Sequence, residues 1–502
     1  MTAVKKIDSN LTGLRIALET TPGVLPVTPN WVGFEPNTYK DFGAVYKKVQ
    51  RAPINASRQR KKGVIVDLDA KAGWAADFTQ NGPQFFMPGL FWAAYRTKAE
   101  LAPTSVTSSN YVVASGGAAY VASDLLFAKN FAVAGNNGLK TVTGSTSTTV
   151  AASGLATDAS AGIISKVGFQ FASGDAAITV PGGVPTFGTT VKDLTTLGLK
   201  VGEWVFVGGD AGGNQFATAA NNCFARILTI ATNAITFDKT FNTMVADAGT
   251  GKTIQLFFGR VIQNELATQD GGLGIVKYTY QLERTLGAPD DSSSNVQAEY
   301  LVNTIMDDFT LVMNTADKLT YDMSVISGTY QTEAAGSQKS GTRPAIVSEN
   351  AYNATTHVKR AQISTIAAEG TPLFAYLSTL SLQIKNNTKA NKAVSVLGAF
   401  DLSAGDFTVS ATSTAYFANV AAVAAIPANT DCTLDIVVTQ NNQGFIFDFP
   451  LLSLGDGALK VTANEPITLP LTVDAATAAS VDVNKNYTCM AIFYDYLPNA
   501  AM

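Results

Sequence analysis

Histidine, cysteine and charge are all scarce in this chain of 502 residues, and each scarcity excludes a class of function. The single histidine, His357, stands in the segment NATTHVKRAQI, and no GxSxG motif occurs, so a serine or cysteine nucleophile would lack its usual base. The three cysteines, Cys223, Cys432 and Cys489, are far apart and odd in number, which gives neither a disulfide framework nor a CxxC metal site. We therefore expect no metal, no other cofactor, and synthesis in a reducing compartment.

Charged residues make up 15% of the chain, whereas about 25% is typical of soluble domains. Hydrophobic residues make up 46%, and the mean hydropathy is +0.13. Two interpretations stay open: much of the surface is buried in an assembly, or the chain has a large β-rich core. No apolar run reaches the roughly 18 residues of a membrane span, and the N-terminus MTAVKKIDSNLTGLRIALE has no apolar signal-peptide core. We expect neither feature.

The bases are unevenly distributed. Residues 46–62 hold seven bases and no acid, so the net charge of −4 for the whole chain leaves −11 for the remainder. With one proline and little periodicity, residues 39–62 are predicted to form a long basic loop. A solvated loop without a partner is one interpretation, and an arm that binds an acidic surface of a neighbouring copy is the other. Nucleic acid is a weaker candidate, because no aromatic residue beyond Tyr46 is interleaved with the bases.

Period-two alternation of apolar and polar residues predicts a mainly β chain. The centre of this pattern lies between Leu377 and Leu454, where four strands are expected around residues 380–384, 407–412, 432–438 and 445–449. Further strands are expected at residues 13–19, 64–78, 276–282, 309–313, 319–325 and 487–497. Two short helices are predicted, one after Pro88 in GPQFFMPGLFWAAYR and one in the Ala-rich segment 416–428.

The composition changes at about Thr97, and Ala, Gly, Ser and Thr dominate as far as about Asp270. Within this region, residues 131–153 (FAVAGNNGLKTVTGSTSTTVAAS) are similar to residues 216–238 (FATAANNCFARILTIATNAITFD). Asn136-Asn137-Gly138 is typical of a hairpin turn. Two similar halves of short strands predict one inserted β domain, and chance similarity in Ala/Thr-rich sequence is the alternative.

Three motifs suggest chemistry that their context does not support. Residues 249–253, GTGKT, are similar to a phosphate-binding loop, but that loop must open a helix and a strand pattern follows here. Asp67 and Asp69 could pair as glycosidase acids or calcium ligands, yet a solvated strand face is commoner. Asp290 and Asp291 lie in a polar stretch that suits a turn.

Three stretches together give the chain a resemblance to a known family. They are RIALETTPGVLPVTPNWVGFEP, the loop ending in NASRQRKKGVIVDLDAKAGWAADF, and the stretch from LFAYLSTLSLQIKNNTKANKAVSVLGAFDLSAGDFTVSATSTAYF through QGFIFDFPLLSLGDG. The chain resembles the major tail tube proteins of long, non-contractile-tailed bacteriophages, the siphophage tail tube family. The likeness covers about residues 1–96 and 272–498 and includes no catalytic signature.

The resemblance implies a fold, a function and a set of partners. The fold is a tail-tube β-sandwich or half-barrel with a flanking helix, formed by residues 1–96 and 272–502, with residues 97–271 as an inserted β-rich outer domain. Copies of the chain, six in a ring or three, stack into a hollow tube through which DNA passes without sequence-specific binding. Tail tip and tail terminator proteins are further partners, no membrane is involved, and the protein belongs to the virion after synthesis in the host cytoplasm. The inter-subunit contact residues are those of the basic arm: Tyr46, Lys47, Lys48, Arg51, Arg58, Arg60, Lys61 and Lys62.

Two other functions compete with this one. The first is a β-rich tail adhesin or receptor-binding protein, which would stop at a closed oligomer where a tube subunit polymerises. The second is a glycan hydrolase that uses Asp67 and Asp69. We expect no enzyme, because neither carboxylate stands in a motif that would set it apart from an ordinary strand residue.

Overall fold

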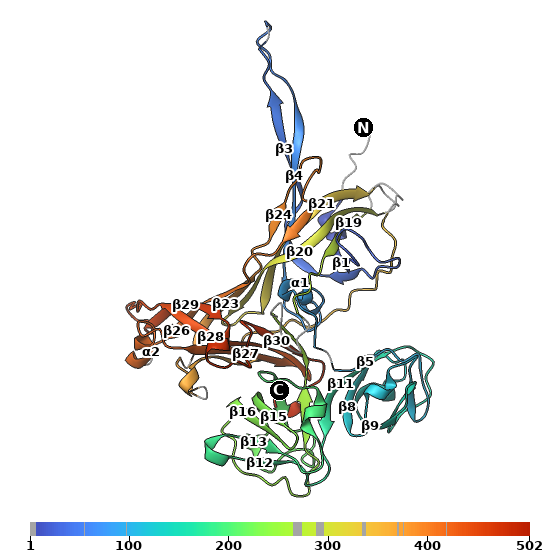
Figure 1. Ribbon diagram of the computed structural model, residues 1–502, viewed down its shortest axis with the longest axis vertical. Coiled ribbons are helices and arrows are strands. Elements are labelled where there is room, and N and C mark those ends of the chain that lie inside the picture. The colour runs from blue at the N-terminus through green and yellow to red at the C-terminus, as the bar shows by residue number, and fades with distance from the viewer. Residues whose placement is uncertain are drawn as a thin grey trace. The chain divides into compact units, whose positions relative to one another are not determined.

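The computed structural model describes residues 7–54, 56–96, 98–264, 274–287, 296–333, 338–368, 371–374, 376–417 and 419–502. The fold is mainly β, with 49% of the chain in strands and 9% helical, in open antiparallel sheets (Figure 1). This confirms the fold class expected from the alternation. Asp290 and Asp291 lie outside the described residues. No helix among the described residues is long and apolar enough to cross a membrane.

The chain forms two compact units. Unit 1 comprises Met1–Ala94, Asn264–Ala354 and Ser378–Thr414. Unit 2 comprises Tyr95–Gln263, Thr355–Leu377 and Ala415–Met502. The segment predicted as an insertion therefore shares a unit with strands from the end of the chain, and its assignment as an outer domain stays a prediction.

Unit 1 is built around one long strand, β20 (Gln297–Asn314). One edge of β20 pairs with β21 (Thr320–Glu333). The other edge pairs first with β19 and then with β23. The remaining strands follow on either side: β21 pairs with β4, which pairs with β3, and β19 pairs with β1, which pairs with β2. Their bounds are β1 Gly13–Leu18, β2 Val32–Phe34, β3 Pro36–Arg51, β4 Lys61–Asp77, β19 Tyr280–Gly287, β23 Leu377–Lys385, β24 Lys389–Asn391, β25 Asp401–Ser403 and β26 Thr408–Tyr416.

Aromatic side chains fill the core of unit 1. Phe86 lies 6.1 Å from Trp74 and 5.6 Å from Tyr321, measured between ring centroids, and Tyr321 lies 5.7 Å from Phe309. Phe86 precedes the short helix α1 (Met87–Phe91), which follows the 3-10 turn η2 (Pro83–Phe85). The predicted helix is confirmed but shorter than expected, because Trp92 takes a left-handed φ of 50° directly after α1.

The strand predicted at residues 276–282 begins only at Tyr280, so its first four residues were predicted wrongly. The neighbouring strand β1 ends at Leu18, directly opposite Tyr280. The backbone amide of Val276 donates instead to the carbonyl oxygen of Trp92. Alternation in the sequence did not reveal that the partner strand ends here.

The C-terminal strands of unit 2 form a sheet around β28 (Gln443–Asp456). One edge of β28 pairs with β27 (Cys432–Gln440), and the other pairs with β30 (Met490–Tyr494) and then β29 (Thr468–Ala476). β27 also pairs with β22 (Val358–Thr365), and β30 with β18 (Arg260–Gln263). The predicted Ala-rich helix is α2 (Val420–Ala424), shorter than the segment 416–428 because β26 continues to Tyr416.

The second sheet of unit 2 has 13 strands among the described residues, in the order β12-β13-β16-β15-β14-β17-β11-β8-β9-β10-β7-β6 with β5 at β11. The two halves of this order mirror one another about the β17–β11 pair. The first half comprises β6 Ser105–Val106, β7 Asn110–Val112, β8 Asp124–Lys129, β9 Gly138–Ser145, β10 Thr149–Ala152 and β11 Ile163–Gln170, with β5 Glu100–Leu101. The second comprises β12 Ala177–Thr179, β13 Thr186–Gly188, β14 Trp204–Val207, β15 Phe224–Ala231, β16 Ala234–Thr240 and β17 Gln255–Phe258.

Side-chain hydrogen bonds show that the two halves are structural repeats. Asn137 accepts a hydrogen bond from the amide of Phe131 and donates to its carbonyl oxygen, and Asn222 does the same with Phe216. The asparagine before each of these also has the same role in both repeats. Asn136 bonds the backbone of Ala156, which follows β10, and Asn221 bonds the backbone of Val245, which follows β16. Similar sequence therefore reflects similar structure.

The hairpin turn predicted at Asn136-Asn137-Gly138 is wrong in detail. A two-residue turn of this type needs positive φ at both central positions, and Asn137 has a φ of −90°. β8 ends at Lys129 and β9 begins at Gly138, so an eight-residue connection containing the 3-10 turn η4 (Ala134–Asn136) joins them. The asparagines serve as side-chain clamps on this connection.

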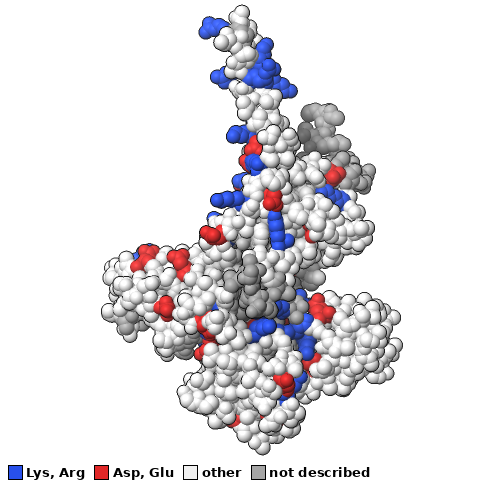
Figure 2. Space-filling model, viewed as in Figure 1, with Lys and Arg blue, Asp and Glu red and all other residues white. Residues whose placement is uncertain are grey.

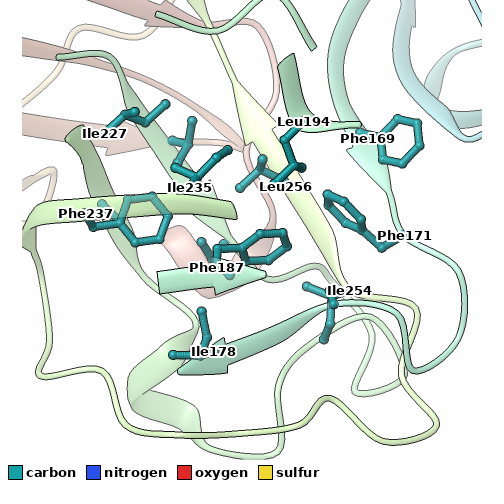
Figure 3. Packing of buried hydrophobic residues seen from close by; sticks show 14 of the residues in the cluster. Phe169, Phe171, Ile178, Phe187, Leu194, Ile227, Ile235, Phe237, Ile254 and Leu256 are labelled. Atoms are coloured by element: carbon teal, nitrogen blue, oxygen red, sulfur yellow. The ribbon is translucent and has the colours of Figure 1, made fainter. Parts of the chain in front are cut away.

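The second repeat has its own hydrophobic core. The rings of Phe171 and Phe187 lie 4.9 Å apart between centroids, and the side chain of Leu256 points toward the same centre (Figure 3). Ile178 and Ile254 close the cluster from the neighbouring segments (Figure 3).

A buried polar network connects the repeats to the C-terminal sheet within unit 2. Asp448, fully buried on β28, accepts hydrogen bonds from Trp204 Nε1 at 3.1 Å, Tyr487 Oη at 3.0 Å and Arg226 Nη1 at 3.2 Å. Arg226 is also fully buried and donates to both carboxylate oxygens of Asp238. Burial raises the pKa of Asp238, but Arg226 and Lys485 outweigh it and the net pKa is lowered.

Replacing Asp448 with Ala should lower the free energy of unfolding by about 3–5 kcal/mol, because two buried donors and a buried guanidinium lose their acceptor. Urea denaturation followed by tryptophan fluorescence measures the change. Asp406→Ala, at an exposed position, is the matched control and should change stability by no more than about 0.5 kcal/mol. Equal effects of the two substitutions would contradict the role of the network.

Candidate inter-subunit contact site

The predicted basic arm is a β-hairpin. β4 pairs with β21 from Ala70 to Asp77, whereas residues 61–69 of β4 pair only with β3 among the described residues. We call residues 45–51 and 61–69 the ribbon, which extends away from the sheet of unit 1 (Figure 1). The expectation of a loop over residues 39–62 is thus wrong, except for residues 52–54 and 56–60 of the connection between the strands. Four register shifts between β3 and β4 interrupt the alternation, which explains why the sequence showed little periodicity.

The structure brings the eight predicted contact residues together on this one element. Four lie on β3 and two on β4, and Arg58 and Arg60 lie in the connection between the strands. All eight are exposed, and the bases gather at the outer end of the ribbon, where Figure 2 shows no acidic side chain. Arg60 Nη1 donates to Gln50 Oε1 at 3.0 Å.

The ribbon also exposes apolar side chains that sequence reasoning missed. The exposed fractions are 62% for Val45, 50% for Val49, 53% for Val64 and 48% for Val66, and Ile54 in the connection is fully exposed. The available signal was the run Val64-Ile65-Val66, because three consecutive apolar residues in a strand cannot all face the same sheet. The alternation from Val64 to Ala70 predicts one covered face along this strand, but the structure covers that face only from Leu68 onward.

Lys392 fixes the base of the ribbon. Its Nζ lies 2.6 Å from Asp67 Oδ2 and also contacts Asp69. The hydrogen bond from Lys392 lowers the pKa of Asp67 below its usual value, so this carboxyl is ionised at neutral pH. A glycosidase general acid needs a raised pKa, which Asp67 does not have. The contacts of Asp67 and Asp69 with Lys392 give both carboxylates an anchoring role.

A bulge marks the point where the ribbon leaves the sheet. The register shifts between Lys40 and Gly43, and Asp41 takes a φ of 47°. The guanidinium of Arg284 lies 4.5 Å from the ring centroid of Phe42, and Lys71 Nζ lies 2.8 Å from Asp41 Oδ2. The bulge on β3 is therefore held by contacts from β19, which carries Arg284, and from β4, which carries Lys71.

The other candidate motifs offer no chemistry in the part of the chain that the structure describes. GTGKT forms a turn in which Gly249 and Gly251 have positive φ, and β17 follows it instead of a helix. All three cysteines are buried, and burial raises the pKa of Cys432 to about 11. The pKa of His357 is lowered mainly by burial and to a smaller extent by the positive charge of Lys359. Within the described ranges, no group of three or more His, Cys, Asp or Glu could hold a metal ion.

Comparison with known protein families gives a match over most of the chain. Residues 9–475 match a family model described as phage tail tube protein. No curated protein matches the chain.

Replacing Lys392 with Met should loosen the base of the ribbon, because Asp67 and Asp69 lose their shared cation. An exposed ion pair stabilises weakly, so amide hydrogen exchange at residues 43–49 should accelerate about two- to fivefold. Lys389→Met removes a neighbouring exposed lysine and serves as the control. In a chain that already carries Asp67→Asn and Asp69→Asn, Lys392→Met should have no further effect; an undiminished effect there would disprove the bridge.

Proposed function

The chain belongs to the phage tail tube protein family, and from this premise we propose that copies of it form rings that stack into a hollow tube for DNA. The match covers residues 9–475 and therefore applies to both units. Membership of the family makes the chain a structural component of a phage tail. The observation that carries the proposal beyond membership is the exposed hairpin of the ribbon and its connection: residues 46–62 of this hairpin hold seven bases and no acid, whereas the remainder of the chain has a net charge of −11.

We assign the ribbon as the contact to the next copy. A two-stranded ribbon is marginally stable in water by itself, so a partner surface that covers it is expected to stabilise it. Basic residues at its outer end attract an acidic body of the same protein and repel another ribbon. The proposed partners are further copies in a ring of six or three, together with tail tip and tail terminator proteins.

The acidic remainder of the chain supports passage of DNA without binding. A channel with negative charge repels phosphate, so a duplex moves through it without sequence-specific contact. The segment 97–271 is placed outside this channel, because a domain of that size would block it. Cryo-EM density for these residues inside the channel would exclude this placement.

Negative-stain electron microscopy of the purified chain at high concentration tests the proposal. Rings or tubes with a channel of about 20 Å or more, wide enough for a DNA duplex, are expected. The alternative is a tail adhesin in which the repeats of the segment 97–271 bind a host surface. An adhesin gives compact closed oligomers at every concentration.

Charge reversal of the ribbon should block stacking. The variant Arg58→Glu, Arg60→Glu, Lys61→Glu and Lys62→Glu places four acids against an acidic neighbour, so tubes should be absent while circular dichroism stays unchanged. The control reverses four exposed lysines away from the ribbon, Lys200, Lys359, Lys389 and Lys460, which changes the net charge by the same amount. Normal tubes from the ribbon variant would refute the role of the arm.

A further inference from the structure

We infer that the ribbon holds the next copy through its apolar side chains and its free strand edges, and that its bases act chiefly during encounter. This inference rests on the proposed function and names the chemistry of the same contact. Its starting point is that at least four valines of the ribbon are about half exposed or more. Covering such side chains lowers the free energy in proportion to the apolar area that is removed from water.

Exposed apolar side chains lie on both faces of the ribbon, because Ile65 is 51% exposed as well. Val49 lies opposite Val64, and Lys48 lies opposite Ile65. Since neighbouring residues of a strand point to opposite faces, Val64 and Ile65 cannot share one. Folding the ribbon back onto its own sheet would therefore cover only part of the apolar surface, whereas insertion against a second molecule can cover both faces.

The strand edges of the ribbon are equally open. Residues 45–51 and 61–69 pair only with each other among the residues that the structure describes. Each outer edge presents a row of backbone donors and acceptors, to which a strand of another molecule can add. Backbone pairing of this kind does not depend on salt.

The contacts of the bases differ from those of the valines in how they respond to salt. They are long, exposed side chains, and ion pairs between exposed groups contribute little and are screened by salt. Their field still acts at a distance, so it accelerates association with an acidic surface. The inferred surface is that of a second copy of this chain, because residues 46–62 hold seven bases and no acid, whereas the rest of each copy carries a net charge of −11.

Two matched variants of the full chain separate the two contributions. The apolar variant carries Val45→Thr, Val49→Thr, Val64→Thr and Val66→Thr, which keep the shape and the strand preference of valine. The neutral variant carries Lys47→Gln, Lys48→Gln, Lys61→Gln and Lys62→Gln. Circular dichroism and the urea midpoint establish that both fold like the unaltered chain. Light scattering then measures the rate of assembly and the critical concentration at 50 mM and 500 mM salt.

For the apolar variant we expect a critical concentration raised about tenfold or more at both salt concentrations. For the neutral variant we expect assembly slowed at least about threefold at 50 mM salt, with an unchanged critical concentration and no difference in rate at 500 mM. Apolar-variant tubes with an unaltered critical concentration, or tubes of the unaltered chain that dissolve at 500 mM salt, would overturn the inference while leaving the proposed function intact. If the unaltered chain forms neither rings nor tubes, the proposed function fails first, and the inference with it.

Discussion

Every β-sheet must cover its apolar face and either pair or protect its edges, and this constraint organises the whole chain. In the second sheet of unit 2 the two repeats solve it together, since β11 and β17 join their edges into one sheet. In unit 1 the aromatic cluster around Phe86 covers the sheet face. Outward from Leu68, the ribbon has neither its faces nor its edges covered by the residues that the structure describes. The combination of open edges and exposed apolar side chains on one hairpin calls for a function.

The buried charges of unit 2 show that scarcity of charge does not mean absence from the core. Lys239 lies 2.5 Å from Asp435, both fully buried, and Arg360 reaches the second oxygen of the same carboxylate. A hydrophobic isostere of such a network would often be as stable, so the network contributes orientation more than stability. It specifies how the repeats align with β27 and β28, where apolar contacts alone would accept several alignments.

The sequence predicted the strands of the core well and the ribbon poorly, for physical reasons. β21 and the second half of β20 alternate cleanly because one face of each is buried, and the period of two records that burial. β27 and the first half of β28 are buried on both faces, and they alternate because one of those faces carries buried polar residues such as Asp435 and Asp448. Outward from Leu68 the ribbon has no buried face, so its sequence is free of that constraint, and bulges further disrupt the pattern. The cluster of bases was visible in the sequence, whereas the exposure of Val45 and Val49 was not, because an exposed apolar residue looks like a core residue in sequence.

The repeats illustrate the opposite case. The similarity of residues 131–153 and 216–238 includes the pairs Asn136-Asn137 and Asn221-Asn222, and the sequence Asn137-Gly138 by itself predicts a hairpin turn. Each side chain instead bonds backbone groups across a longer connection. A dipeptide predicts a turn reliably only when its side chains make no hydrogen bonds to distant parts of the fold. Such hydrogen bonds depend on the tertiary structure, which the local sequence does not reveal.

The composition of the ribbon also resolves a conflict that any exposed assembly element faces. Apolar strands with open edges aggregate with their own kind, because two identical edges can pair. Here residues 46–62 hold seven bases and no acid, so two ribbons that approach each other by their outer ends repel before their edges can meet. In the proposed assembly, the same bases are attracted to the acidic remainder of another copy. The positive charge at the outer end of the ribbon would then disfavour the symmetric contact and favour a head-to-tail one, which is the geometry that extends an assembly in one direction.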